Sequence, residues 1–207
     1  MQTIDCDYLI IGSGIAGLLS AVHLSQHGEV VLVTKKERAE SNTNYAQGGI
    51  ACVVDSEDSF EDHVRDTLDA GAGLCDEAVV RAIVSGGPER IAELETLGVV
   101  FAEEAGEGRR YDLGKEGGHS RRRVLHAGDI TGREIESALL RRALAGPRVR
   151  ILEQCMAIDL VTTGGLGLSE PNRCVGTYVL DRRSGEIMGV RAPCTVLATG
   201  GGGKVYL

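Results

Sequence analysis

Six residues near the N-terminus, Gly12–Gly17 (G-S-G-I-A-G), have the spacing of a loop that holds phosphate groups. The first glycine of such a loop permits a tight turn, the second lets backbone approach a pyrophosphate, and the third lets a helix pack on a strand. Backbone amides at the start of that helix then bind the phosphates. The pattern is informative only between a strand and a helix. Pyrophosphate contacts are therefore predicted for Gly12, Ser13, Gly14, Ile15, Ala16 and Gly17.

The flanking residues supply that context. The apolar run Tyr8–Ile11 predicts a buried strand, and Ile15 to His27 has the apolar spacing of a helix that Gly28 ends. Val30–Val33 predicts a second buried strand, which completes a βαβ unit. A dinucleotide site is therefore favoured over a simple glycine-rich turn.

One usual element of such a site is missing. An acidic residue at the end of the second strand usually binds the ribose, but Thr34, Lys35 and Lys36 occupy that place here. The nearest carboxylate, Glu37, lies slightly beyond the usual position. Two explanations remain open at this point. One is a pocket for a 2′-phosphate, as in NADP binding, and the other is a ribose contacted in another way.

The middle of the chain predicts helices and then short strands. Helices are expected near 59–70 and 76–85, from Pro88 to Leu97 after a break at Gly86–Pro88, and over Thr131–Ala145. The last of these should face inward through Ile135, Ala138, Leu139 and Leu144. Turn residues then separate five strand-like segments, two of which are joined as a hairpin by the turn at Arg182–Gly185: 149–153, 157–162, 175–181, 186–191 and 195–198.

Composition excludes several functions. The 207 residues carry 22 Lys and Arg against 30 Asp and Glu, a net charge of −8, which argues against binding nucleic acid or an anionic membrane. No apolar run approaches the ~20 residues of a membrane helix. The first residues are acidic and show no secretory signal, so we expect a cytoplasmic location. The six cysteines lie far apart, so reduced thiols and no metal site are expected.

Two segments favour flavin over nicotinamide. Ser41–Ile50 mixes small residues with side-chain amides and ends near a glycine pair, so its backbone can lie against a flat ring. Thr195–Gly201 reads as a buried strand that ends abruptly in glycines. A βαβ unit, a long insertion, a meander and such a strand follow one another in two-part FAD-binding domains.

Charged residues in the insertion have simpler interpretations. By themselves, Arg121–Arg123 are expected to be a solvated charge run, and Glu116 a solvated carboxylate in a glycine-rich loop. His63 is expected on the surface of its helix.

Further motifs extend over nearly the whole chain: Asn42–Gly49, Glu116–Arg123 (E-G-G-H-S-R-R-R), His126–Arg133 (H-A-G-D-I-T-G-R) and Ala198–Tyr206. With the Gly12–Gly17 loop, they make the chain resemble the N-terminal part of the L-aspartate oxidases, within the succinate dehydrogenase/fumarate reductase flavoprotein superfamily. The resemblance implies an α/β fold. It would be a Rossmann-like FAD-binding domain with a helical insertion and an antiparallel β-meander, which occupies residues 1–207 and is truncated before the capping domain.

The resemblance also assigns contacts to FAD. The resemblance implies that Thr34 and Lys35, in place of the usual acid, are normal for the L-aspartate oxidases. It also implies that Lys35 contacts the cofactor. The other implied contacts are Asn42, Thr43, Asn44, Tyr45, Ala46, Gln47, Gly48, Gly49, Met156, Ala157, Thr199 and Gly200. No metal is implied.

The implied reaction is oxidation of L-aspartate to iminoaspartate, the first step of de novo NAD biosynthesis, with oxygen or fumarate as electron acceptor. A functional link to quinolinate synthase follows. Glu116 would orient the substrate, because a carboxylate there attracts an ammonium group and repels a plain dianion, whereas succinate dehydrogenases and fumarate reductases have Phe.

Alternatives are a fumarate reductase- or succinate dehydrogenase-like flavoprotein, another amino-acid-oxidising flavoprotein, or a non-catalytic FAD-binding fragment. In this family the capping domain and the catalytic Arg lie beyond the A-T-G-G strand. We therefore expect the 207-residue chain alone not to turn over aspartate.

The residue at position 42 predicts how the flavin is held. Succinate dehydrogenases and fumarate reductases often carry a flavin-linked His there, whereas this chain has Asn42, whose amide cannot form that bond. FAD should therefore be non-covalent and pass into the supernatant after acid precipitation, as absorbance at flavin wavelengths would show. Flavin that stays in the pellet would contradict this prediction.

Overall fold

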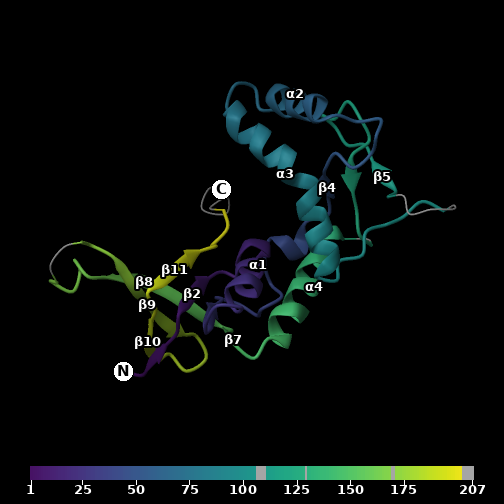
Figure 1. Ribbon diagram of the computed structural model, residues 1–207. Helices are drawn as coiled ribbons and strands as arrows, with labels where there is room; N and C mark the ends of the chain where they lie inside the picture. The colour runs from purple at the N-terminus through teal and green to yellow at the C-terminus, as the bar shows by residue number, and fades with distance from the viewer. Residues whose placement is uncertain (106–110, 129, 169–170, 202–207) are drawn as a thin grey trace. The chain divides into compact units, whose positions relative to one another are not determined.

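The computed structural model describes residues 1–105, 111–128, 130–168 and 171–201 (Figure 1). The chain forms two compact units. The first comprises Met1–Asn44 and the residues from Glu136 onward, and the second is the insertion Tyr45–Ile135.

A parallel sheet forms the centre of the first unit. Its strand order is β11 (Cys194–Leu197), β2 (Tyr8–Ile11), β3 (Val30–Val33) and β7 (Val149–Leu152). β3 is buried along its whole length, as its continuous apolar sequence predicts. Helix α1 (Ile15–Leu24) joins β2 to β3, so the predicted βαβ unit is confirmed. The helix ends at Leu24 rather than His27, because the amides of Gln26 and His27 bond carbonyls three residues back.

An antiparallel meander forms the second sheet of this unit. Its order is β1 (Thr3–Asp5), β10 (Ile187–Arg191), β9 (Cys174–Asp181) and β8 (Cys155–Thr162). The meander β8–β9–β10 is confirmed, whereas β1 was not predicted and pairs with β10 in parallel. Three residues with one buried side chain, Ile4, are too short a pattern to indicate a strand. Buried apolar residues of both sheets share one core, including Ile4, Leu9, Val31, Val179 and Val190.

The second unit contains two helices and a small sheet. Helix α2 (Phe60–Ala70) begins where the Ser59 side chain accepts a hydrogen bond from the Asp62 amide. The sheet consists of β4 (Ile50–Ala51), β6 (Val124–Leu125) and β5 (Leu113–Gly114), all antiparallel.

Helix α3 (Glu77–Thr96) is continuous, whereas the sequence predicts two helices separated at Gly86–Pro88. A proline clashes with the Cβ of the preceding residue, and Gly87 has none. A Cβ at Gly87 would lie 2.9 Å from Cys52 Sγ, so the helix packs closely there. Buried Val84 and Ile91 hold the helix on both sides of Pro88.

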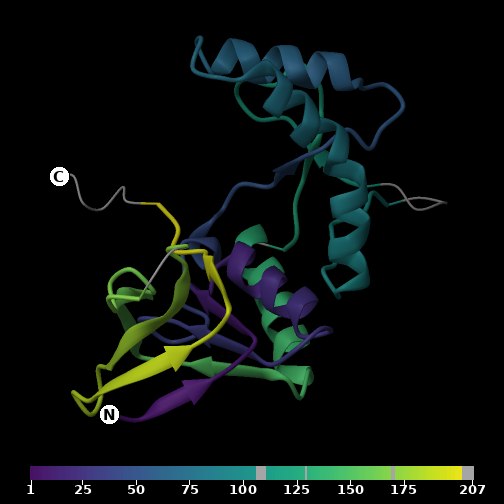
Figure 2. The same ribbon diagram turned by 60° about the vertical axis from the view of Figure 1, so that its left-hand side comes forward.

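Helix α4 (Thr131–Ala145) has the predicted bounds. Ile135, Ala138 and Leu139 are buried as expected, but Leu144 is 45% exposed and Ala143 is buried instead. Ala143 lies four residues after Leu139, on the same helical face, whereas Leu144 is turned ~100° further round. In the first unit, α1 and the later part of α4 lie side by side (Figure 1 and Figure 2).

Arg123 is the centre of a buried ion cluster in the second unit. Its side chain is 0% exposed and donates to both oxygens of Asp58 at 2.8 Å and to Asp66 at 2.6 Å. Burial opposes ionisation of Asp66, but hydrogen bonds from Ser120 and the Arg123 guanidinium overcome it and lower the Asp66 pKa to about 2. The prediction of a solvated arginine run is therefore wrong for Arg123, although Arg121 is exposed.

Replacing Arg123 should destabilise the second unit strongly. Arg123→Met would leave two carboxylates without their cation, at a cost of about 3–5 kcal/mol of unfolding free energy. Urea denaturation followed by circular dichroism measures this cost. Arg121→Met, whose side chain is 54% exposed, should change the unfolding free energy by no more than about 0.5 kcal/mol. Equal losses in the two variants would contradict the central role of Arg123.

Candidate functional site

The Gly12–Gly17 loop joins the end of β2 to the start of α1 in very close packing. Gly12 has φ +117°, and a Cβ there would lie 2.1 Å from the Ala198 carbonyl oxygen. A Cβ at Gly17 would lie 1.9 Å from the Gly12 carbonyl oxygen. Both positions therefore require glycine, one for the turn and one for the approach of helix to strand.

The start of α1 suits a phosphate group. Gly14 is the N-cap residue, it has no side-chain cap, and the first turn contains no acidic residue. The first amides of a helix lack partners within the helix and carry partial positive charge. The Thr43 hydroxyl accepts from the Ile15 amide at 3.2 Å, and a Cβ at Gly14 would lie 3.4 Å from the same oxygen. Thr43 and the glycine loop, both predicted cofactor contacts, are therefore neighbours.

Thr34 occupies the position where a ribose-binding acid usually stands. Its hydroxyl lies 2.9 Å from the Ser13 hydroxyl, and both side chains are buried. The Thr34 carbonyl accepts from the Cys155 amide at 2.9 Å, so the start of β8 lies beside this strand end. Predicted contacts Lys35, Met156 and Ala157 directly follow these two residues along the chain.

The end of β11 reaches two of the predicted contact segments. The Ala198 amide donates to the Ile11 carbonyl at 2.9 Å, which holds Thr199 and Gly200 beside the end of β2. Gly200 has φ +75°, and a Cβ there would lie 4.0 Å from Asn42 Nδ2. Asn42 therefore lies close to the glycine turn after β11.

The remaining predicted contacts belong to the second unit. A Cβ at Gly48 would lie 3.8 Å from both carboxylate oxygens of Glu116. A Cβ at Gly49 would lie 2.1 Å from the Leu125 carbonyl oxygen, so this glycine packs tightly on β6. Tyr45 is 62% exposed, Gln47 is exposed, and the Ala46 carbonyl accepts from the Gly132 amide at 3.1 Å. Within this unit, the predicted substrate residue is adjacent to the predicted flavin-binding backbone.

The Arg123 cluster anchors the loop that carries Glu116. The Ser120 amide and hydroxyl each donate to Asp66 at 2.8 Å, and the His119 amide donates to the Glu116 carbonyl at 3.3 Å. The His119 ring lies edge-on to His63, with centroids 5.9 Å apart. His63 was expected on the surface but is buried, and this burial together with the nearby Arg123 charge lowers its pKa.

Glu136 was not identified from sequence. Its side chain is 1% exposed, and burial raises its pKa to about 7, while the Ser41 side chain opposes that rise. The sequence does indicate that Glu136 is buried. The residue lies three residues before Leu139 and seven before Ala143, on the inward face of α4.

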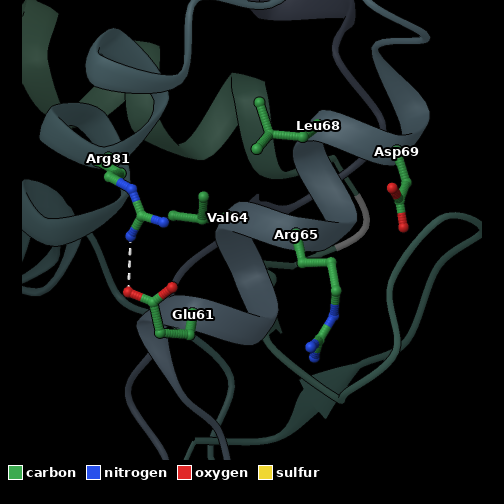
Figure 3. Close-up of a pocket in the computed structure, with 6 residues that line it drawn as sticks. All are labelled: Glu61, Val64, Arg65, Leu68, Asp69 and Arg81. Atoms are coloured by element: carbon green, nitrogen blue, oxygen red, sulfur yellow. Dashed lines mark hydrogen bonds and ion pairs between the residues drawn. The ribbon is translucent and has the colours of Figure 1, made fainter.

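A hollow of about 220 Å³ lies between α2 and α3, where Arg81 donates to Glu61 at 2.6 Å (Figure 3). None of its lining residues is a predicted cofactor contact: Glu61, Val64, Arg65, Leu68, Asp69 and Arg81.

The described part of the chain contains no group of three or more His, Cys, Asp or Glu that could hold a metal ion. Among these residues there is also no helix long and apolar enough to cross a membrane.

Comparison with known proteins identifies the nucleotide. A family described as an FAD binding domain matches residues 7–206. The chain belongs to this family. FAD is therefore the cofactor of this FAD-binding domain, and the 2′-phosphate explanation of the Thr34–Lys35 substitution is set aside. The glycine cradle and the acid-free start of α1 fit its pyrophosphate.

Named relatives are similar over almost the whole chain. L-aspartate oxidase 1 of Ralstonia nicotianae is 48% identical over 201 residues, which cover 97% of this chain and 38% of the relative. L-aspartate oxidase of Vibrio cholerae is 46% identical, with 98% and 38% covered. A quinol fumarate reductase structure from E. coli matches 100% of this chain and 34% of its own, with TM-score 0.88 and 29% identity. The chain thus spans about 38% of the length of these curated relatives.

The crowding at Gly17 predicts the effect of one methyl group. Gly17→Ala should weaken FAD binding at least about tenfold and lower the unfolding free energy by about 1–3 kcal/mol, because α1 must move away from the Gly12 carbonyl. Quenching of flavin fluorescence measures binding, and urea denaturation measures stability. Gly86→Ala is the control, since a Cβ there meets nothing within 4 Å in α3. It should leave FAD binding unchanged and stabilise by up to about 1 kcal/mol. Similar losses in both variants would contradict the prediction.

Proposed function

We propose that this chain forms the flavin-binding part of an L-aspartate oxidase, which oxidises L-aspartate to iminoaspartate with oxygen or fumarate as electron acceptor. The observation that carries the proposal is the position of Glu116, whose carboxylate lies beside Gly48 on a loop anchored by Asp66. Identity of 48% to a named L-aspartate oxidase supports it. Both units would then belong to one FAD-binding domain.

The cofactor would be held without a covalent bond. Backbone and small side chains of Gly12–Gly17, Asn42–Gly49, Thr199 and Gly200 would bind it, together with Lys35, Met156 and Ala157. When bound, FAD would supply the hydride acceptor for the substrate Cα. The protein would supply the groups that position the substrate and stabilise its charge. Glu116 would hold the ammonium group of aspartate, which orients Cα and excludes a plain dicarboxylate of net charge −2.

The main alternative is a fumarate reductase- or succinate dehydrogenase-like flavoprotein, which the TM-score of 0.88 to a quinol fumarate reductase supports. Asn42 and Glu116 favour the aspartate oxidase, because the alternative family carries His and Phe at these positions. A role in the first step of NAD biosynthesis, a link to quinolinate synthase and a cytoplasmic location remain predictions. So does the expectation that the 207-residue chain alone does not turn over aspartate.

A chimera tests the proposal whatever the natural length of the protein. The matched residues of the Ralstonia nicotianae enzyme are replaced by those of this chain, and aspartate-dependent peroxide formation is measured. We expect the chimera to oxidise aspartate. Glu116→Phe in the chimera should lower kcat/KM for aspartate at least about 100-fold, as loss of a charge-assisted contact of about 3 kcal/mol implies, and should leave the flavin content unchanged.

Glu29→Gln is the matched control, because it removes an exposed carboxylate of the first unit. It should leave both kcat/KM and flavin content unchanged. A chimera that binds flavin but oxidises succinate rather than aspartate would favour the alternative family. Undiminished aspartate oxidation by the Glu116→Phe chimera would show that Glu116 does not recognise the ammonium group.

A further inference from the structure

Three connecting segments of the first unit meet at the end of β3, the place where the adenosine ribose of a dinucleotide usually binds. The Lys36 carbonyl accepts from the amide of Gln154, which lies in the turn between β7 and β8, at 2.9 Å. The Lys35 carbonyl accepts from Arg182 Nη1 at 2.8 Å, although Arg182 lies 147 positions later in the sequence, in the turn between β9 and β10. The Arg182 amide donates to the Gln154 carbonyl at 2.9 Å, so each segment bonds both of the others.

Gln154 is strained at the centre of this junction. Its φ of +56° lies in the left-handed region, which a residue with a side chain rarely adopts unless the surrounding contacts impose it. Its amide and its carbonyl are both bonded, and its Oε1 lies 3.4 Å from Arg182 Nη1. The next residue, Cys155, begins β8, which continues with the predicted cofactor contacts Met156 and Ala157. The junction therefore connects two segments that carry predicted FAD contacts.

The Arg182 guanidinium contributes a charged donor to this junction. A hydrogen bond from a charged donor is stronger than one between neutral groups, and this bond fixes the backbone that carries the exposed Lys35 side chain. The turn itself does not depend on the guanidinium. The Asp181 carboxylate closes the turn by accepting from the amides of Arg183 at 2.8 Å and Ser184 at 3.3 Å. Loss of the Arg182 side chain should therefore release Lys35 and leave the turn in place.

We propose that Arg182 is a positioning residue of the FAD site, whose guanidinium fixes the Lys35 backbone so that the Lys35 ammonium group reaches the adenosine end of the cofactor. The inference rests on the proposed contact between Lys35 and FAD and adds the residue that holds Lys35 in place. FAD carries a negative diphosphate, which a cation at the end of β3 attracts. A fixed cation binds it more tightly than a mobile one, because less conformational freedom is lost on binding.

The test measures the FAD affinity of the 207-residue chain by quenching of flavin fluorescence. Arg182→Met removes the guanidinium and keeps an unbranched stem, and its dissociation constant should be about threefold to tenfold higher, the effect of one lost hydrogen bond. Arg183→Met removes the same charge from the next residue of the turn, which is also exposed, and should leave the dissociation constant unchanged. Equal weakening in both variants would overturn the positioning role, because the general loss of positive charge would explain it.

Two further variants separate an effect through Lys35 from a general structural effect. Lys35→Met should itself weaken FAD binding at least about threefold. Adding Arg182→Met to Lys35→Met should then change the dissociation constant less than about twofold, because no ammonium group remains to be positioned. The full loss in this background would overturn the proposal. A clearly lower urea midpoint for Arg182→Met than for Arg183→Met would also overturn it, since it would show a structural role.

The same variants distinguish failure of this inference from failure of the function on which it rests. Unchanged binding in Arg182→Met together with weaker binding in Lys35→Met would overturn the role of Arg182 alone. Unchanged binding in Lys35→Met would contradict the proposed contact of Lys35 with FAD, and this inference with it. Failure of the unmodified chain to bind FAD would instead contradict the proposed function, and this inference with it.

Discussion

The first unit depends on one crowded contact between backbones. Gly12, Gly17 and Ala198 bring the ends of β2 and β11 and the start of α1 so close that a single Cβ would lie about 2 Å from a carbonyl oxygen. The contact sets where the first amides of α1 point. It also places the turn after β11 next to Asn42, and the proposed cofactor contacts of this unit depend on that placement. Because carbonyl and Cβ atoms cannot share the space, only glycine fits at positions 12 and 17.

The second unit depends on charge rather than on close backbone packing. Arg123 is fully buried, and it neutralises Asp58 and Asp66 while Ser120 donates to Asp66 twice. A buried ion cluster of this kind adds little net stability, but it tolerates no loss of a partner. It therefore fixes the loop that carries Glu116. The proposed role of Glu116 in binding the substrate would need such a fixed loop, since a small displacement weakens a charge-assisted contact.

Glu136 presents the opposite arrangement of a buried acid. Asp66 accepts hydrogen bonds from Ser120 and Arg123, and its pKa falls to about 2. Neither side-chain oxygen of Glu136 has a hydrogen-bond partner among the described residues, and burial raises its pKa to about 7. The same residue chemistry is therefore held charged in one unit and close to neutral in the other. The difference follows from the donors that surround each carboxyl group.

Local patterns determined much of this protein. The apolar runs of β2 and β3, the glycine spacing of the Gly12–Gly17 loop, the bounds of α4 and the order of the meander were all predictable, because each depends on residues close together in the chain. Only the tertiary structure decided that α3 continues through Pro88, since Gly87 and its packing against Cys52 lie outside any local rule. The same holds for the burial of Arg123 and Glu136. The partners of Arg123, Asp58 and Asp66, lie 65 and 57 residues away in the sequence, and a charged residue has no burial pattern until distant segments are placed around it.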